Sequence, residues 1–254
     1  MFNNKFHRLR MLTVAGGIML ASPASAGPPL NIDDPGILDP GQWEVIVASS
    51  SAKEKGGGTA SELPVLDVSL GLSDNTQISA AYPYVVVDPE GASSESDFGN
   101  LAVGFKWRFY NSENLQIAFA PGYSFGISLT AATLGVGSDT PITLLPVNLE
   151  YALGNWTLSA ELAFAAIQQE EDEVAFGGAI GHPLGDRIQL MFEIYGATNS
   201  ELDDAFVNWN LGADIEITPS WHVLAAFGSR ISEPTGAAEL DYTAYLGIQY
   251  FTGM

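Results

Sequence analysis

The feature that most constrains the fold is a two-residue alternation between large apolar side chains and small or polar ones. Leu101, Val103 and Phe105, for example, alternate with Ala102 and Gly104. Successive side chains of a strand point to opposite faces of a sheet, so this period predicts strands. Twelve such runs follow one another: Gln42–Ser50, Val65–Leu72, Gln77–Val86, Asn100–Tyr110, Leu115–Ser128, Ile142–Leu153, Trp156–Ile167, Val174–Gly181, Ile188–Gly196, Val207–Ile217, Trp221–Gly228 and Tyr242–Phe251.

The connections between these runs alternate between tight turns and longer loops. The turns are Asp74-Asn75, Asn111–Asn114, Gly154-Asn155, Pro183–Arg187 and Thr218–Ser220. The loops, rich in Gly, Ser and acidic residues, are Ser51–Ala60, Asp88–Asp97, Thr130–Thr140, Gln168–Glu173, Asn199–Ala205 and Ser232–Asp241. A soluble sandwich also shows alternation, but short turns on one side and long loops on the other are typical of an outer-membrane barrel.

Charged residues within the runs fall on one face only, which also favours a membrane barrel. They are Glu44, Asp67, Lys106, Arg108, Glu150, Glu161, Glu193, Asp214 and Glu216. The opposite, apolar face carries no charge, as contact with hydrocarbon requires. We therefore predict an all-β, antiparallel, closed transmembrane barrel over residues 42–254. Twelve strands are expected, with ten as the alternative because Val174–Gly181 is short and glycine-rich.

The first residues read as a targeting signal. Lys5, Arg8 and Arg10 precede the apolar stretch Met11–Leu20, and Ala24-Ser25-Ala26 forms a small-x-small cleavage site. The apolar stretch is roughly half of what a membrane-spanning helix needs. We predict a cleaved signal peptide over 1–26, a periplasmic segment over 27–41, and a location in the bacterial outer membrane. Both termini would then lie in the periplasm and the long loops outside.

Composition excludes several other classes. The 254 residues include no cysteine, which rules out disulfides, cysteine-based zinc sites and a cysteine nucleophile. With 30 acidic and only 9 basic residues, the chain would repel nucleic acid. A periplasmic aromatic girdle is expected from Trp43, Trp107, Tyr151, Trp156 and Trp221.

A short motif marks the entry to the first run: Asp33, Asp34, Pro35, Gly41, Trp43 and Glu44. This opening resembles that of the outer-membrane family described as "putative MetA-pathway of phenol degradation", whose members are often called simply transporters. The resemblance implies a signal peptide, this opening and alternating strands to the end. It also implies uptake of hydrophobic or aromatic small molecules. Tyr245, Gly247 and Tyr250 look like most of the usual barrel-assembly signal, although Thr252-Gly253-Met254 follow the last aromatic residue.

An enzyme is the weaker interpretation. His182 and His222 lie beside predicted turns, and no serine is placed to partner either of them as in an outer-membrane lipase. The acidic run Glu170–Glu173 matches no calcium-binding loop, and it reads as a solvated loop or one that touches lipopolysaccharide through divalent ions. No metal or cofactor is expected.

The nine charged residues are therefore predicted to line the lumen. Seven carboxylates against two cations predict a cation preference, with Lys106 and Arg108 facing Asp214 and Glu216 across the periplasmic mouth. The alternative is an N-terminal segment folded into the mouth, whose Asp33 and Asp34 neutralise the two cations. We expect a barrel that passes small molecules passively, in contact with lipid, lipopolysaccharide and the assembly machinery. The rival is a non-conducting anchor or surface-interaction barrel.

Overall fold

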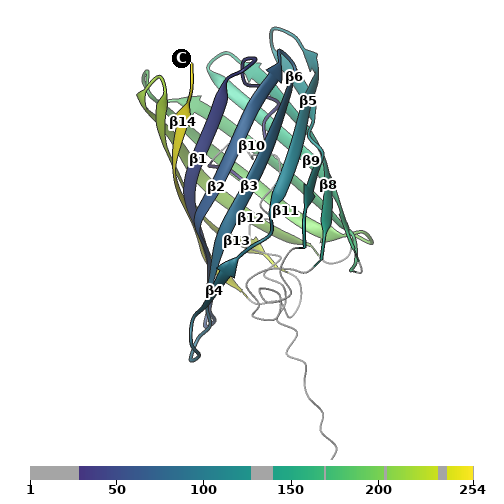
Figure 1. The fold of residues 1–254 in the computed structure, drawn as a ribbon, viewed down its shortest axis with the longest axis vertical. Helices are drawn as coiled ribbons and strands as arrows, with labels where there is room; N and C mark the ends of the chain where they lie inside the picture. The colour runs from purple at the N-terminus through teal and green to yellow at the C-terminus, as the bar shows by residue number, and fades with distance from the viewer. Residues whose placement is uncertain (1–28, 127–139, 169, 203–204, 234–238, 254) are drawn as a thin grey trace, which may run out of the picture.

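The computed structural model describes residues 29–126, 140–168, 170–202, 205–233 and 239–253 (Figure 1). Its strands are β1 (Trp43–Glu54), β2 (Thr59–Ser73), β3 (Thr76–Asp88), β4 (Glu95–Phe98), β5 (Ala102–Asn111), β6 (Leu115–Phe119), β7 (Gly122–Ser124), β8 (Ile142–Leu153), β9 (Trp156–Ile167), β10 (Glu173–Pro183), β11 (Ile188–Asn199), β12 (Phe206–Thr218), β13 (Trp221–Ser232) and β14 (Leu240–Phe251). Among the described residues, no helix is long and apolar enough to cross a membrane. The predicted signal peptide, and all but the last residue of the predicted loop Thr130–Thr140, lie outside them.

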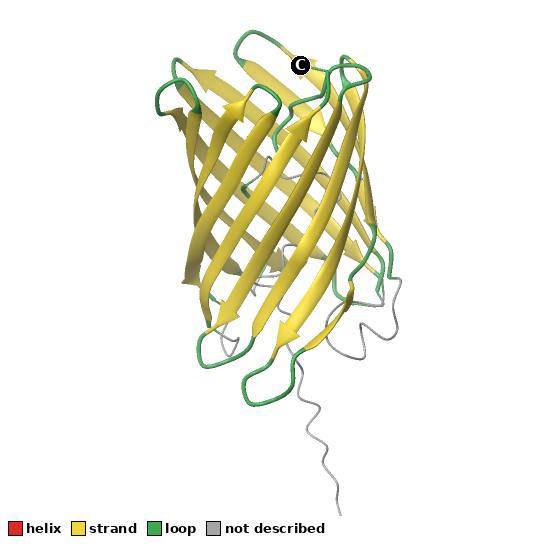
Figure 2. Cartoon of the chain, turned by 60° about the vertical axis from the view of Figure 1, so that its left-hand side comes forward, coloured by secondary structure: helices red, strands yellow, loops and turns green. Residues whose placement is uncertain are grey.

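The sheet closes on itself as a barrel of tilted antiparallel strands (Figure 2). β4 and β5 both pair with β3, and β6 and β7 both pair with β5 and β8, so each pair forms one interrupted barrel strand. Twelve barrel strands result, and β1 pairs with β14 along its length to complete the ring. The prediction of twelve strands is confirmed. The ten-strand alternative is wrong, because β10 pairs with both β9 and β11.

Two neighbouring barrel strands are interrupted, and the sequence pattern predicted neither interruption: β4 lies mostly in the predicted loop Asp88–Asp97, and a second break falls inside a predicted run. The run Asn100–Tyr110 begins at Ala102 and is preceded by β4, whereas Leu115–Ser128 is split into β6 and β7 around Pro121. Pro121 has no N–H to donate to a strand ladder. Its carbonyl still accepts the Phe105 N–H, with a nitrogen–oxygen distance of 3.0 Å. The apolar alternation continues across the break, which is why the pattern did not reveal it.

One end of the barrel carries the tight turns and the other the longer connections; we call them the turn end and the loop end. The C-terminus lies at the turn end (Figure 1). At the loop end the strands are longer than predicted, and most of the predicted loop Ser51–Ala60 belongs to β1 and β2, leaving a connection of residues 55–58. Small and polar side chains there hide the strand period.

A twelve-residue strand such as β1 rises roughly 40 Å, or about 30 Å along the axis when tilted by about 40°. That length matches a bilayer core.

The outer surface of the barrel is apolar along its length. Val103, Phe192 and Leu211, which were predicted to face hydrocarbon, are 37%, 40% and 55% exposed, whereas the neighbouring Ala102 is fully buried. The five predicted girdle residues are all exposed near the turn end: Trp43, Trp107, Tyr151, Trp156 and Trp221. An exposed apolar belt of this extent needs lipid around it rather than water.

Candidate functional site

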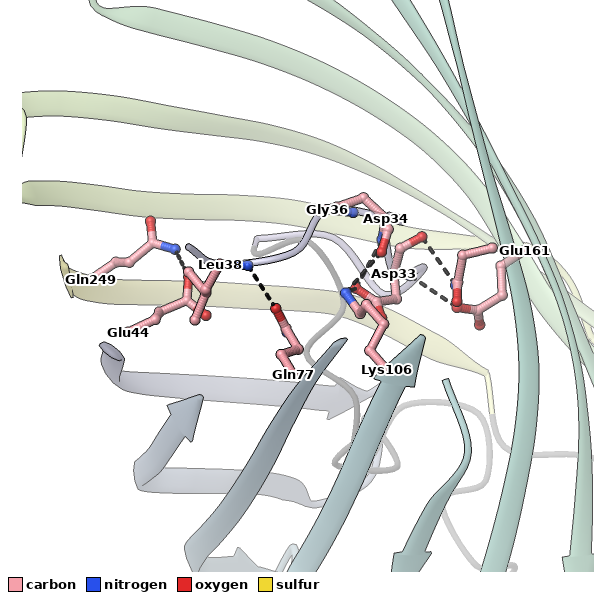
Figure 3. Close-up of polar contacts among 10 residues, drawn as sticks. Asp33, Asp34, Gly36, Leu38, Glu44, Gln77, Lys106, Glu161 and Gln249 are labelled. Carbon is pink, nitrogen blue, oxygen red and sulfur yellow. Dashed lines mark hydrogen bonds and ion pairs between the residues drawn. The ribbon is translucent and has the colours of Figure 1, made fainter. Parts of the chain in front are cut away.

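The interior of the barrel is occupied by the chain itself. The N-terminal segment, defined here as residues 29–42, crosses the lumen from β11 and β12 on one wall to β2 and β3 on the other, and then continues into β1 (Figure 3). We expected residues 27–41 to lie outside the barrel in the periplasm, and for the described residues 29–41 that expectation is wrong. Leu30 and Ile32 bury their apolar side chains against the wall, and the N–H groups of the segment meet carboxylates there.

The inner end of the segment is held by Glu193 of β11, which is completely buried. Its carboxylate accepts hydrogen bonds from the backbone N–H of Ile32 at 2.7 Å and of Asn31 at 2.9 Å. The Asn210 side chain on β12 donates to the same carboxylate at 2.9 Å. Several donors to one buried carboxylate balance the cost of removing its charge from water. Glu193 therefore acts as the anchor of the inner end.

The centre of the segment is held by an ion pair between Asp33 and Lys106 of β5. The Lys106 Nζ lies 2.8 Å from Asp33 Oδ1 and 2.8 Å from the Asp34 carbonyl oxygen (Figure 3). Both side chains are almost fully buried, with 5% and 2% exposed. Glu161 of β9 accepts the Asp33 N–H at 2.9 Å. The segment is thus tied at one residue to two parts of the wall that lie three barrel strands apart.

The outer end of the segment packs against the turn end of β2 and β3. The Leu38 N–H donates to the Gln77 side chain at 3.1 Å, and Gly41 and Gln42 exchange backbone hydrogen bonds with Gly71 at 2.9 and 3.0 Å. Gly41 has φ of +82°, a conformation that favours glycine. A side chain at position 71 would collide with the carbonyl groups of Leu38 and Asp39.

These contacts give the predicted motif a physical role. Asp33 pairs with Lys106, Pro35 is fully buried, and Gly41 makes the bend into β1. Trp43 is exposed among the girdle residues, and Glu44 accepts a hydrogen bond from Gln249 at 2.5 Å. The motif that suggested the family resemblance is therefore the sequence that places the segment in the lumen.

The strand register places all nine predicted lumen charges on the inward face: Glu44, Asp67, Lys106, Arg108, Glu150, Glu161, Glu193, Asp214 and Glu216. Their role along a solute path stays a prediction. The predicted field between two cations and two carboxylates across an open mouth is wrong for Lys106, because the N-terminal segment lies between the walls and Asp33 neutralises it. Arg108 instead donates to Gln116 and to the Asp74 carbonyl oxygen, at 3.0 and 2.9 Å. Asp214 lies 2.7 Å from His222 Nδ1.

A cavity of about 400 Å³ remains beside the segment, toward the turn end. Strand residues form one side of it: Glu44, Gln77, Lys106, Glu150, Thr157, Ser159, Ala179, Gly181, Gln189, Met191, Asp214, His222, Gln249 and Phe251. The segment forms the other side: Leu30, Ile32, Asp33, Asp34, Gly36, Ile37 and Leu38. No group of three or more potential metal ligands occurs in the part of the chain that the structure describes.

Sequence reasoning missed several interior residues. Glu62 is buried and accepts a hydrogen bond from Ser50 at 3.0 Å, and Arg230 lies 4.8 Å over the Phe206 ring. Both fall in parts of β2 and β13 that we had predicted to be outside the strands. The inward amides Asn148 and Asn210 were also missed. They stand on the same alternating face as the charges, and that position was the signal that could have identified them.

Fold and interior together define a class: a twelve-stranded outer-membrane-type β-barrel whose lumen holds its own N-terminal segment. A family model described as "Putative MetA-pathway of phenol degradation" matches residues 56–246. The chain belongs to this family. The matched residues cover the barrel from the first loop-end connection onward, so the Asp33–Glu44 motif lies outside the match.

Solved structures share the fold at low sequence identity. An outer membrane channel from Pseudomonas putida F1 aligns with a TM-score of 0.67 and 13% identity, covering 86% of this chain and 98% of that one. The KdgM porin in complex with disordered oligogalacturonate aligns with a TM-score of 0.57 and 9% identity over 82% and 98%. The translocator domain of the autotransporter NalP from Neisseria meningitidis aligns with 0.55 and 12% over 82% and 88%. No curated protein matches.

Proposed function

We propose that this protein passes small molecules passively across the outer membrane, along the space beside its N-terminal segment. The observation that carries the proposal is the cavity of about 400 Å³ between the segment and the wall, since a barrel built only as an anchor needs no such space. The family description points to phenolic and other aromatic compounds as candidate solutes. A channel and a porin among the structures of the same fold are consistent with this reading.

The charge of the interior favours cations over anions. Seven of the predicted lumen charges are carboxylates, and Glu62 adds another, whereas Lys106 is engaged by Asp33. Low-dielectric walls concentrate the field of such an excess, and added salt weakens it. Reversal potentials under a salt gradient would then show a cation preference that declines as salt is raised. An anion preference would contradict it.

The test is conductance of the purified full-length mature protein in a planar bilayer, with and without added phenol. We expect small conductance steps from the wild type and larger ones after deletion of residues 31–39. Phenol should reduce the ion current of the wild type as it occupies the path. Absence of conductance from the wild type would overturn the proposal, whatever the deletion shows.

A non-conducting barrel is the second candidate, because the segment contacts both walls and buries Asp33 and Lys106. It predicts no current from the wild type and a clear current after the deletion. In this reading the barrel acts as an anchor and its loop-end connections make the surface contacts. We propose no catalytic role, because no serine is hydrogen-bonded to either His182 or His222 within the described residues.

We further propose that the loop end faces the cell exterior and the lipopolysaccharide, and that the turn end faces the periplasm, as is usual for outer-membrane barrels. Ser93→Cys, in the β3–β4 connection, should react with an impermeant maleimide on intact cells. Asn75→Cys, in the β2–β3 turn, should react only after the membrane is opened. The reverse pattern would contradict the orientation.

A further inference from the structure

We propose that the cavity beside the N-terminal segment binds one small organic cation with an apolar body, such as an arylalkylamine. The inference rests on the proposed function in one respect, namely that solutes reach this space through the lumen. It goes beyond that function by assigning a binding site and the chemical class of its ligand.

The charge around the cavity is not balanced by the protein. Five carboxylates line it, and the one lysine among the lining residues is already bound to Asp33 and the Asp34 carbonyl oxygen. Asp214 has His222 as its partner, and Glu44 has Gln249. Glu150 makes no hydrogen bond or ion pair with any described residue. Asp34 and Glu150 are therefore left without a cation that neutralises them.

A second observation points to a missing donor at the same place. Asp33 is 98% buried and lines the cavity, and its Oδ1 is used by Lys106. Its Oδ2 is buried and has no hydrogen-bond partner among the described residues. A buried carboxylate oxygen without a donor is costly, and an ammonium group supplies up to three donors. A protonated amine in the cavity supplies the positive charge that Asp34 and Glu150 lack, and its N–H groups are the donors that Asp33 Oδ2 would meet once this side chain turns toward the cavity.

Apolar side chains also line the cavity, and they favour a cation that carries an apolar body. Leu30, Ile37 and Leu38 of the segment and Met191 and Phe251 of the wall line the space. A volume of about 400 Å³ is at the small end of ligand sites. The methionine thioether and the aromatic ring make favourable contacts with an aryl group. An inorganic cation would leave these side chains unused, and an anion would meet the carboxylates.

Binding can be measured by calorimetry on the full-length mature protein in detergent, with three probes of one shape. These are 2-phenylethylammonium, 2-phenylethanol and phenylacetate, all at pH 7. We expect the ammonium to bind at least about tenfold more tightly than the alcohol, since charged hydrogen bonds are the stronger ones. Phenylacetate should not bind, and raised salt should weaken ammonium binding.

Glu150→Gln should reduce ammonium affinity about tenfold and leave alcohol binding unchanged. Glu173→Gln is the matched control, because this inward carboxylate lies on β10 at the loop end and does not line the cavity. Folding of each variant is checked by its heat-dependent migration on gels. Should Glu150→Gln fail to fold, Asp34→Asn takes its place, with the same expected loss.

Equal binding of the ammonium and the alcohol, or equal losses in Glu150→Gln and Glu173→Gln, would overturn the binding site. The proposed function is judged separately by conductance. Current without selective ammonium binding refutes the site and leaves passive passage standing. Selective binding without current from the wild type or from the deletion of residues 31–39 supports the site and refutes passage.

Discussion

The two halves of the barrel interior differ in where their inward polar groups find interaction partners. In the turn-end half, inward carboxylates meet donors that come from a separate piece of chain, as Glu193 does with Asn31 and Ile32. In the loop-end half, the contacts of inward groups come from neighbours in the wall: Glu62 accepts a hydrogen bond from Ser50, and Arg230 lies over the Phe206 ring. In one half the partners come from the N-terminal segment, and in the other they come from the wall itself.

This difference predicts that the segment controls access to the lumen, whereas the wall controls the stability of the barrel. Changes in turn-end contacts should release the segment and alter access to the lumen, and leave the barrel closed. Changes on the outer face should weaken the barrel and leave the segment in place. Each prediction below tests this division.

The largest effect is expected from Lys106→Ala. Removing one member of a buried ion pair leaves the other uncompensated, at a cost of about 3–5 kcal/mol. Because the segment is joined to the wall only by side chains and a short backbone contact, it should leave the lumen rather than accept that cost. A reporter cysteine in place of Leu38, which is partly buried, should react faster with maleimide in detergent. Asp33→Asn combined with Lys106→Met should bring the rate most of the way back, and an unchanged rate in Lys106→Ala would contradict the comparison.

A change on the lipid face should affect stability instead of access. Leu211→Arg places a cation on a side chain that is 55% exposed at the outer surface of β12. Arginine there should cost roughly 2–4 kcal/mol of unfolding free energy in liposomes. Glu216→Arg, on the inward face of the same strand, is the control and should cost far less. Equal costs in a urea titration would mean that the register is wrong.

A steric change at the outer end of the segment should have an intermediate effect. Gly71→Ala introduces a methyl group against the carbonyl groups of Leu38 and Asp39, and such overpacking costs about 1–3 kcal/mol. We expect partial reactivity of the same reporter cysteine with barrel stability almost unchanged. Gly178→Ala is the matched control, since the nearest atom to its added carbon would lie 3.6 Å away. Identical behaviour of the two variants would contradict a tight fit at position 71.

The smallest effect is expected at the loop-end surface. Lys55 lies 2.7 Å from Glu239, and this hydrogen bond raises the pKa of the lysine. A raised pKa favours the folded state below the ordinary lysine value and loses that contribution as pH rises through the shifted one. Both side chains are largely exposed, so Lys55→Ala should leave the unfolding midpoint and the reporter reactivity unchanged. A measurable loss at low salt would show that this connection contributes to barrel stability.

The wall could be predicted from the sequence far better than the N-terminal segment could. The wall repeats every two residues, so Val103 and Ala102 could be assigned to opposite faces from the sequence alone. The N-terminal segment has no period, and the pairing of Asp33 with Lys106 joins residues 73 positions apart, so it could be raised only as an alternative to a free lysine. The break between β6 and β7 was missed because Pro121 interrupts hydrogen bonding without interrupting the apolar pattern.

The position of the N-terminal segment relative to the β1–β14 seam has a consequence for the order of assembly. The segment is continuous with β1, and its inner end is bound to β12 and β11, which lie three and four strands from β1 across the seam. While β1 and β14 are apart, the segment can be laid against β11 and β12 from the side, as the sheet curls around it. Once β14 pairs with β1, the ring has no free edge, and the same segment can enter only by passing end-on through a mouth. The pairing of β1 with β14 therefore decides the order of assembly: before it the barrel can close around the segment, and after it the segment must be inserted through a mouth.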